Sequence, residues 1–146
     1  MVKKISFRQR FEFLKSKAYW LGFFANLTYS LPFVTITTYG GLLAVETARA
    51  TFAQVEWLFF VFFFASFVTR INLTDLQSKR FALIVISVIL TILGLTLIYL
   101  SHNLLTLIVA FGILGVPHGT TYPVTASYVA DTSSTYNLPS ANAFYH

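Results

Sequence analysis

The sequence contains no cysteine, so it offers no disulfide, no thiolate metal site and no redox-active thiol. Charged residues are scarce too, at 10% of the chain, whereas a soluble domain normally has about a quarter of its residues charged. Hydrophobic residues make up 56% of the chain, and the mean hydropathy is +0.71. These values exclude an ordinary soluble domain and indicate that lipid surrounds most of the protein.

Positive charge is the one charged feature in excess, with a net charge of +5. A basic protein can bind nucleic acid, but here most lysines and arginines lie in two short segments beside apolar runs. That placement is typical of segments that contact anionic lipid headgroups. We therefore expect the lipid bilayer as a partner, and no nucleic acid.

The first basic segment is residues 1–17, in which the only acidic residue is Glu12. Its apolar residues recur at helical spacing, which predicts a short interfacial helix; they are Phe7, Phe11 and Leu14, continued by Ala18. A mobile basic tail is the alternative. A basic start before an apolar run also occurs in signal peptides, but the uncharged run Ala18–Val45 has 28 residues, against roughly 7–15 in a signal peptide.

The apolar stretches predict an all-α, polytopic membrane helix bundle in the cell membrane, with four spans at residues 18–45, 50–69, 81–100 and 104–130. The second stretch is the weakest, because its uncharged part, Trp57–Thr69, has only 13 residues and could instead be a buried or re-entrant helix. If it crosses, nine of the ten Lys and Arg residues share one side, which the positive-inside rule favours.

The third and fourth spans come from one uncharged run, Phe81–Ala130, which as a single helix would measure about 75 Å and must therefore fold back. The polar turn Ser101–Asn103 is the predicted fold-back point. This arrangement makes both termini cytoplasmic. Residues 132–146 read as a cytoplasmic loop followed by the start of a further helix at Leu138–Ser140, so we expect an incomplete protein; a short carboxy-terminal amphipathic stub is the alternative.

The fourth span carries the most chemistry. Pro117 and Pro123 each remove a backbone donor, which predicts a broken helix that faces a polar cavity. His118 and Tyr122 share one face of this helix. A stripe of small residues lies beside that face and predicts close helix packing; it consists of Gly112, Gly115 and Gly119, continued by Ala126.

His118 is the only titratable side chain near the middle of the membrane, tyrosines aside. It can be a substrate donor or a proton carrier. It can equally be a neutral imidazole bonded to a carbonyl that proline leaves free. In the first span, Asn26 and Tyr29 share a helical face near Pro32, where we expect a kink. They fit either a ligand site or hydrogen bonds between helices.

Together these features give a set of cavity candidates, Asn26, Tyr29, His118 and Tyr122, and a set of helix-break or gating candidates, Pro32, Pro117 and Pro123. Spans one and four are both interrupted by proline and polar in the middle, a pattern that points to a transport site in repeat-built transporters. The phenylalanines of residues 59–67 surround their helix and read as lipid-facing and packing surface.

Several motifs follow one another along the chain: Tyr39–Leu43 at the end of span one, the Phe-rich second span ending in Arg70, a basic inner loop, Gly115–Pro123, Tyr128–Asp131 and Ser140–Ala143. These motifs give the chain a resemblance to the major facilitator superfamily. The resemblance covers nearly the whole chain through loose motifs. It implies four of the family's twelve helices, in a secondary transporter that works by alternating access, with a small solute as cargo and protons as a candidate coupling ion.

The chain departs from the family's loop signature G-x-x-x-D-R-x-G-x-[RK]-[RK], of which only Lys79 and Arg80 match. The other signature positions hold Arg70, Thr74, Asp75 and Gln77, and Phe111 stands where the fourth helix commonly has arginine. These departures suit helices seven to ten better than one to four. Four spans alone would need the missing transporter half or helices, or a homo-oligomer.

Two other classes of protein compete with this interpretation. One is a small four-span membrane protein that works by oligomerisation, as a scaffold or exporter, although a proton-coupled exporter of that size should have a carboxylate inside its first span. The other is an intramembrane enzyme. No nucleophile–base pair or metal-ligand cluster appears in the sequence, so we expect no catalytic residue, no metal and no cofactor.

Overall fold

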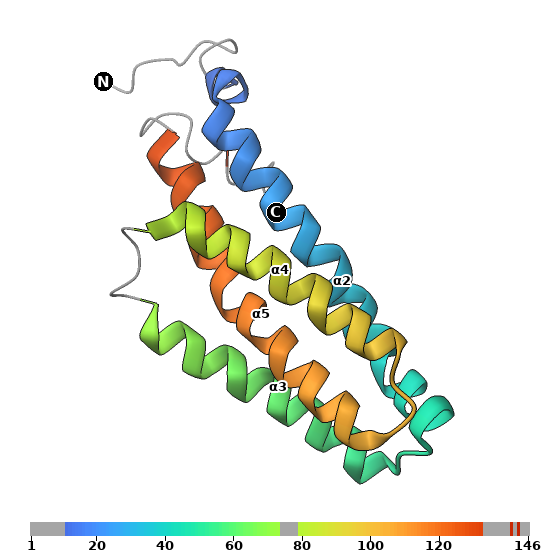
Figure 1. Ribbon diagram of the computed structural model, residues 1–146. Helices are drawn as coiled ribbons and strands as arrows, with labels where there is room; N and C mark the ends of the chain where they lie inside the picture. The colour runs from blue at the N-terminus through green and yellow to red at the C-terminus, as the bar shows by residue number, and fades with distance from the viewer. Residues whose placement is uncertain (1–10, 74–78, 133–140, 142, 144–146) are drawn as a thin grey trace, which may run out of the picture.

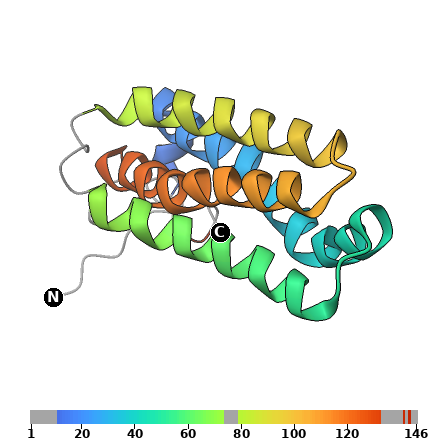
Figure 2. The ribbon, with the colours of Figure 1, turned by 60° about the horizontal axis from the view of Figure 1, so that its bottom comes forward.

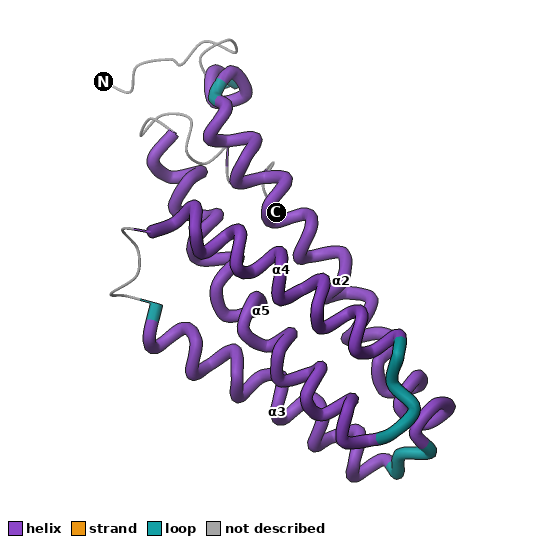
Figure 3. Tube along the Cα trace, in the orientation of Figure 1, coloured by secondary structure: helices purple, strands orange, loops and turns teal. Residues whose placement is uncertain are grey.

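The computed structural model describes residues 11–73, 79–132, 141 and 143. A short 3-10 helix, η1 (Glu12–Lys15), leads into four long α-helices, shown in Figures 1 and 3. These are α2 (Lys17–Ala48), α3 (Phe52–Asn72), α4 (Arg80–Tyr99) and α5 (Leu104–Thr132). No strand occurs within the described residues. The all-α fold class is therefore confirmed.

Three of the helices, α3, α4 and residues Leu104–Asp131 of α5, are long and apolar enough to cross a membrane. α2 is longer than any of them but is not among the three, and polar side chains such as Asn26 and Tyr29 interrupt its apolar sequence. The helices overlie the four predicted spans, and most ends agree within two residues. The largest differences are that α2 continues to Ala48 and α3 to Asn72, three residues past the predicted ends in each case.

Backbone and side-chain caps explain where several of the helices begin and end. Arg49 closes α2 in the left-handed conformation (φ 52°), and its N–H donates to the carbonyl of Ala44. Thr51 and Gln54 then form a capping box that starts α3. Asn103 accepts a hydrogen bond from the N–H of Thr106 at the start of α5. These caps produce the two tight turns that lie close together at the lower right of Figure 1.

α5 is the core of the bundle. It packs against α2, α3 and α4, whereas those three helices make few contacts with one another. Figure 2 shows α5 between α4 on one side and α3 on the other, with α2 behind. Half of the apolar window of α5 is buried within the bundle, against 17% for α3 and 28% for α4. The central axis of this unit is thus filled by a helix.

The prolines do not break α5. The helix runs without interruption from Leu104 to Thr132 with Pro117 and Pro123 inside it, and α2 likewise continues through Pro32. The prediction of a broken fourth span is therefore wrong. Each proline removes a single backbone hydrogen bond, and the bonds on either side are enough to keep the helix continuous.

The interfacial helix predicted for the amino-terminal segment falls mostly outside the described residues. The described part begins at residue 11, and there the chain forms the single turn of η1. The buried residue is Phe13, which packs on Tyr19 together with Val129 and Ala141. The predicted loop and helix start within residues 132–146 also fall largely outside the described residues.

Candidate functional site

Tyr29 of α2 and His118 of α5 meet in the middle of the bundle. The Tyr29 hydroxyl and Nδ1 of His118 share a hydrogen bond, and their ring centroids lie 5.6 Å apart. Tyr29 is buried, and His118 is half-buried. Both residues were cavity candidates on the sequence alone, and the fold brings them together across 89 residues of chain.

Aromatic rings from two helices surround this imidazole. Phe33, one turn beyond Tyr29, stacks on it with ring centroids 4.4 Å apart and an 18° angle between the rings. From α3, Phe62 lies 5.1 Å away and Phe63 lies 5.9 Å away at a steep angle. We call Tyr29, Phe33, Phe62, Phe63 and His118 the aromatic site. It joins α2, α3 and α5 at one point.

The small-residue stripe explains how α3 comes so close to His118. A Cβ atom on Gly115 would collide with the Phe62 carbonyl oxygen and would lie 2.8 Å from the Ala65 Cβ. One on Gly119 would lie 2.5 Å from the Ser66 carbonyl oxygen. The two glycines lie on either side of His118 in the sequence. Because they have no Cβ atom, the backbone of α3 can come close to α5 at the level of the imidazole. Gly112, the third member of the stripe, has ordinary clearance, 3.4 Å to Val61.

The other two cavity candidates do not join the aromatic site. Asn26 is half-buried, and its side chain makes no hydrogen bond to another described residue. Tyr122 is 42% exposed and lies one turn beyond His118 on α5. Of the proline candidates, Pro117 is fully buried beside His118, whereas Pro32 and Pro123 are half-buried.

Three of the aromatic residues were missed by the sequence analysis. Phe33 was not singled out, and Phe62 and Phe63 were read as lipid-facing and packing surface rather than as neighbours of His118. Phe62 is 1% exposed, while its neighbour Phe64 is 56% exposed. The available signal was the four-residue spacing of Leu58, Phe62 and Ser66, the buried line of α3. It is weak because the residues between them are also apolar.

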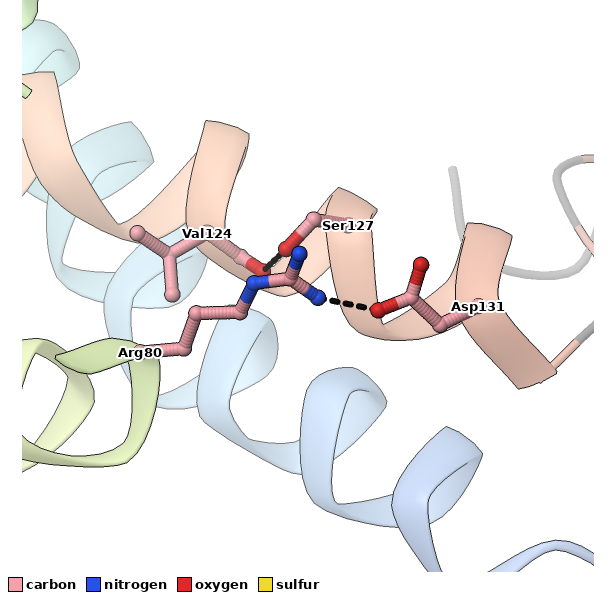
Figure 4. Close-up of polar contacts among 4 residues, drawn as sticks. All are labelled: Arg80, Val124, Ser127 and Asp131. Atoms are coloured by element: carbon pink, nitrogen blue, oxygen red, sulfur yellow. Dashed lines mark hydrogen bonds and ion pairs between the residues drawn. The ribbon is translucent and has the colours of Figure 1, made fainter. Parts of the chain in front are cut away.

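A second polar contact lies at the end of the bundle opposite the two tight turns. Figure 4 shows Arg80, the first residue of α4, forming an ion pair with Asp131 near the end of α5. The same figure shows Ser127 donating to the carbonyl of Val124, 2.6 Å away. The side chains of Arg80 and Asp131 are 28% and 62% exposed, so water reaches the pair.

The aromatic site offers hydrogen-bonding groups next to apolar rings. Nε2 of His118 has no partner among the described residues, and an imidazole nitrogen can donate or accept a proton. No group of three or more metal-ligating side chains occurs in the described part of the chain. The chemistry present therefore suits reversible binding of a polar group.

Comparison with protein families gives a match to the Major Facilitator Superfamily over residues 18–146. Comparison with curated proteins and with solved structures gave no match. The matched region contains all four long helices and the aromatic site. Members of this family are membrane transporters rather than enzymes. The family match covers most of the chain, and three of its helices are long and apolar enough to cross a membrane. The chain is therefore a membrane protein of the Major Facilitator Superfamily.

Proposed function

We propose that this chain is part of a secondary active transporter that moves a small solute across the membrane by alternating access. The observation that carries the proposal is the hydrogen-bonded pair Tyr29–His118. Ionisable side chains within a membrane are costly and are usually functional. This pair joins the two helices that contain proline, as expected where repeats of a transporter form a central site.

The proposed site has a definite chemistry. Nε2 of the half-buried His118 is available to a solute, while Nδ1 is held by Tyr29. The ring of Phe33 covers one face of the imidazole. Asn26 and Tyr122 would add polar contacts from the same two helices. Such a set of neutral donors and acceptors on apolar walls suits a small polar solute, with a proton on His118 as a candidate coupling ion.

On this proposal the transport path lies along the side of this four-helix unit, where the half-buried His118 is partly exposed, because α5 fills the centre of the unit. The path would therefore form between this unit and a second one, either the remaining helices of a longer transporter or another copy of this chain. On this proposal Pro32, Pro117 and Pro123 would let α2 and α5 bend at the gates. They supply local weak points in helices that are otherwise continuous.

The orientation follows from charge. Lys15, Lys17, Arg70, Lys79 and Arg80 lie at the end of the bundle that holds the starts of α2 and α4 (Figure 1). Among the described residues only Arg49 is basic at the other end. The positive-inside rule then makes the first end cytoplasmic, with four crossings and both termini inside.

Thiol labelling tests the proposal, because the natural chain has no cysteine. Cysteine is placed singly at His118 and Tyr122, with Phe64 as the matched control on the outer face of the bundle. A membrane-impermeant charged reagent is added to each side of the membrane in turn. We expect labelling at 118 and 122 from both sides and none at 64. If neither position 118 nor position 122 reacts with reagent added to either side, the proposed water-filled path is contradicted.

A further inference from the structure

The first turns of α3 carry a small surface pocket that the transport site does not use. It is lined by Glu56, Trp57 and Phe60, is open to the outside and has a volume of about 270 Å³. The two rings form a corner, with centroids 5.2 Å apart and an angle of 81° between them. Its residues belong to the first turns of α3, at the end of the helix opposite the one that holds Arg70.

Glu56 brings a negative charge close to the lipid. α3 has 21 residues, which span about 31 Å, close to the roughly 30 Å thickness of the hydrocarbon core. Glu56 follows Phe52, the first residue of the helix, by about 6 Å along the axis. Side chains on a helix lean toward its amino terminus, so all three pocket residues lean toward the headgroups.

No basic residue of the described chain neutralises this carboxylate. The ion pair that the described residues form is Arg80–Asp131, at the opposite end of the bundle. Arg49 lies at the same end as Glu56 but forms no ion pair with it. A carboxylate at the edge of the hydrocarbon favours a cationic partner, since an isolated charge there is costly.

The chemistry of the lining selects the kind of cation. Indole and phenyl faces attract cations through their ring quadrupoles, and indole does so most strongly. Aromatic corners of this kind hold quaternary ammonium groups, which a carboxylate then neutralises. The pocket is smaller than the roughly 300–1,000 Å³ of drug-sized ligand sites, so it fits a headgroup rather than a whole lipid.

We propose that Glu56, Trp57 and Phe60 form a binding site for a quaternary ammonium group at the membrane surface that faces away from the cytoplasm. The group can belong to a choline lipid headgroup or to a free organic cation, which share the same chemistry. This site is independent of the aromatic site around His118, because it involves none of its residues.

The chain contains only two tryptophans, Trp20 and Trp57, so a Trp20→Phe background excited at a wavelength that tyrosine does not absorb makes Trp57 the sole reporter. The full chain is placed in nanodiscs of phosphatidylglycerol, which has no ammonium group. Tetramethylammonium is titrated against sodium at constant ionic strength, and Trp57 emission is recorded. We expect a saturable change. Glu56→Gln or Phe60→Leu should raise the half-saturating concentration by roughly threefold to tenfold.

Glu46→Gln is the matched control, because Glu46 is an exposed carboxylate at the same end of the bundle and is not part of the pocket. It should leave the titration unchanged. A second arm adds phosphatidylcholine to the nanodiscs. If this lipid shifts Trp57 emission and weakens tetramethylammonium binding, the occupant is a lipid headgroup; if it does neither, the site takes a free cation. The proposal is overturned if tetramethylammonium gives no saturable change, or if Glu56→Gln titrates like the parent.

Discussion

Arg80 and Asp131 form an ion pair although each lies at the end of its helix where its charge is unfavourable. Arg80 begins α4, and Asp131 lies in the last turn of α5. The helix dipole disfavours a cation at an amino terminus and an anion at a carboxyl terminus. Pairing the two side chains across adjacent helix ends offsets both effects and links α4 to α5.

The net contribution of this pair to stability should be small, because both side chains are in contact with water. Exposed ion pairs typically contribute about 0.2–1 kcal/mol. We expect Arg80→Gln or Asp131→Asn to lower the free energy of unfolding by less than about 1 kcal/mol. The double variant should be no less stable than either single one, because it also removes both dipole penalties. Thermal unfolding in detergent measures this cycle, and a loss of several kcal/mol in a single variant would contradict it.

The glycines of α5 should differ sharply in their response to alanine. Gly115→Ala and Gly119→Ala each place a Cβ atom against the α3 backbone, so we expect a loss of roughly 1–3 kcal/mol despite a better helix propensity. Gly112→Ala is the matched control, since its Cβ would lie 3.4 Å from Val61. It should be neutral or stabilising by up to about 1 kcal/mol. Equal effects at all three positions would mean that α3 and α5 are not in close contact.

Hydrogen bonding between Tyr29 and His118 should be measurable as a coupling energy. Tyr29→Phe removes the hydroxyl, and His118→Phe keeps a ring next to Phe33 while removing the imidazole nitrogens. Hydrogen bonds between membrane helices have coupling energies of about 0.6 kcal/mol on average and up to about 1.7. We expect a value in that range from the double-mutant cycle. A value of zero would show that the two groups do not interact.

Phe62 should be the phenylalanine of α3 that matters most for stability. It is 1% exposed and packs on both Phe33 and His118, so Phe62→Ala leaves a cavity between three helices. We expect a loss of roughly 3 kcal/mol, the lower end of the range for such changes, because lipid is as apolar as the bundle interior. Phe64→Ala, at a site 56% exposed, should have little effect on the unfolding midpoint.

Much of the helix arrangement could be predicted because it depends on local sequence. The Ser101–Asn103 turn separates two long uncharged runs, and α5 begins at Leu104, as the sequence indicates. The sequence placed Tyr29 and His118 in the same group of cavity candidates, but it did not predict that the two side chains form a hydrogen bond. The sequence analysis did not predict that α5 is continuous. Pro117 and Pro123 each remove one backbone hydrogen bond, and this loss affects only the turn in which the proline lies.

The central place of α5 could not be predicted from hydrophobic periodicity. In a membrane, lipid-facing and buried faces are both apolar, so sequence alone does not separate Phe62 from Phe64. The Arg80–Asp131 pair joins residues 51 positions apart and depends on how α4 packs along α5. Such contacts follow from tertiary packing, which spacing within a single helix does not encode.

The most direct test of the account is to determine on which side of the membrane each end of each helix lies. Single cysteines replace Lys15, Glu46, Lys79 and His102, all of them exposed, and are labelled with an impermeant thiol reagent from either side. We predict that positions 46 and 102 react only from outside and positions 15 and 79 only from inside. Labelling of positions 15 and 46 from the same side would show that α2 does not cross the membrane and would contradict the four-span account.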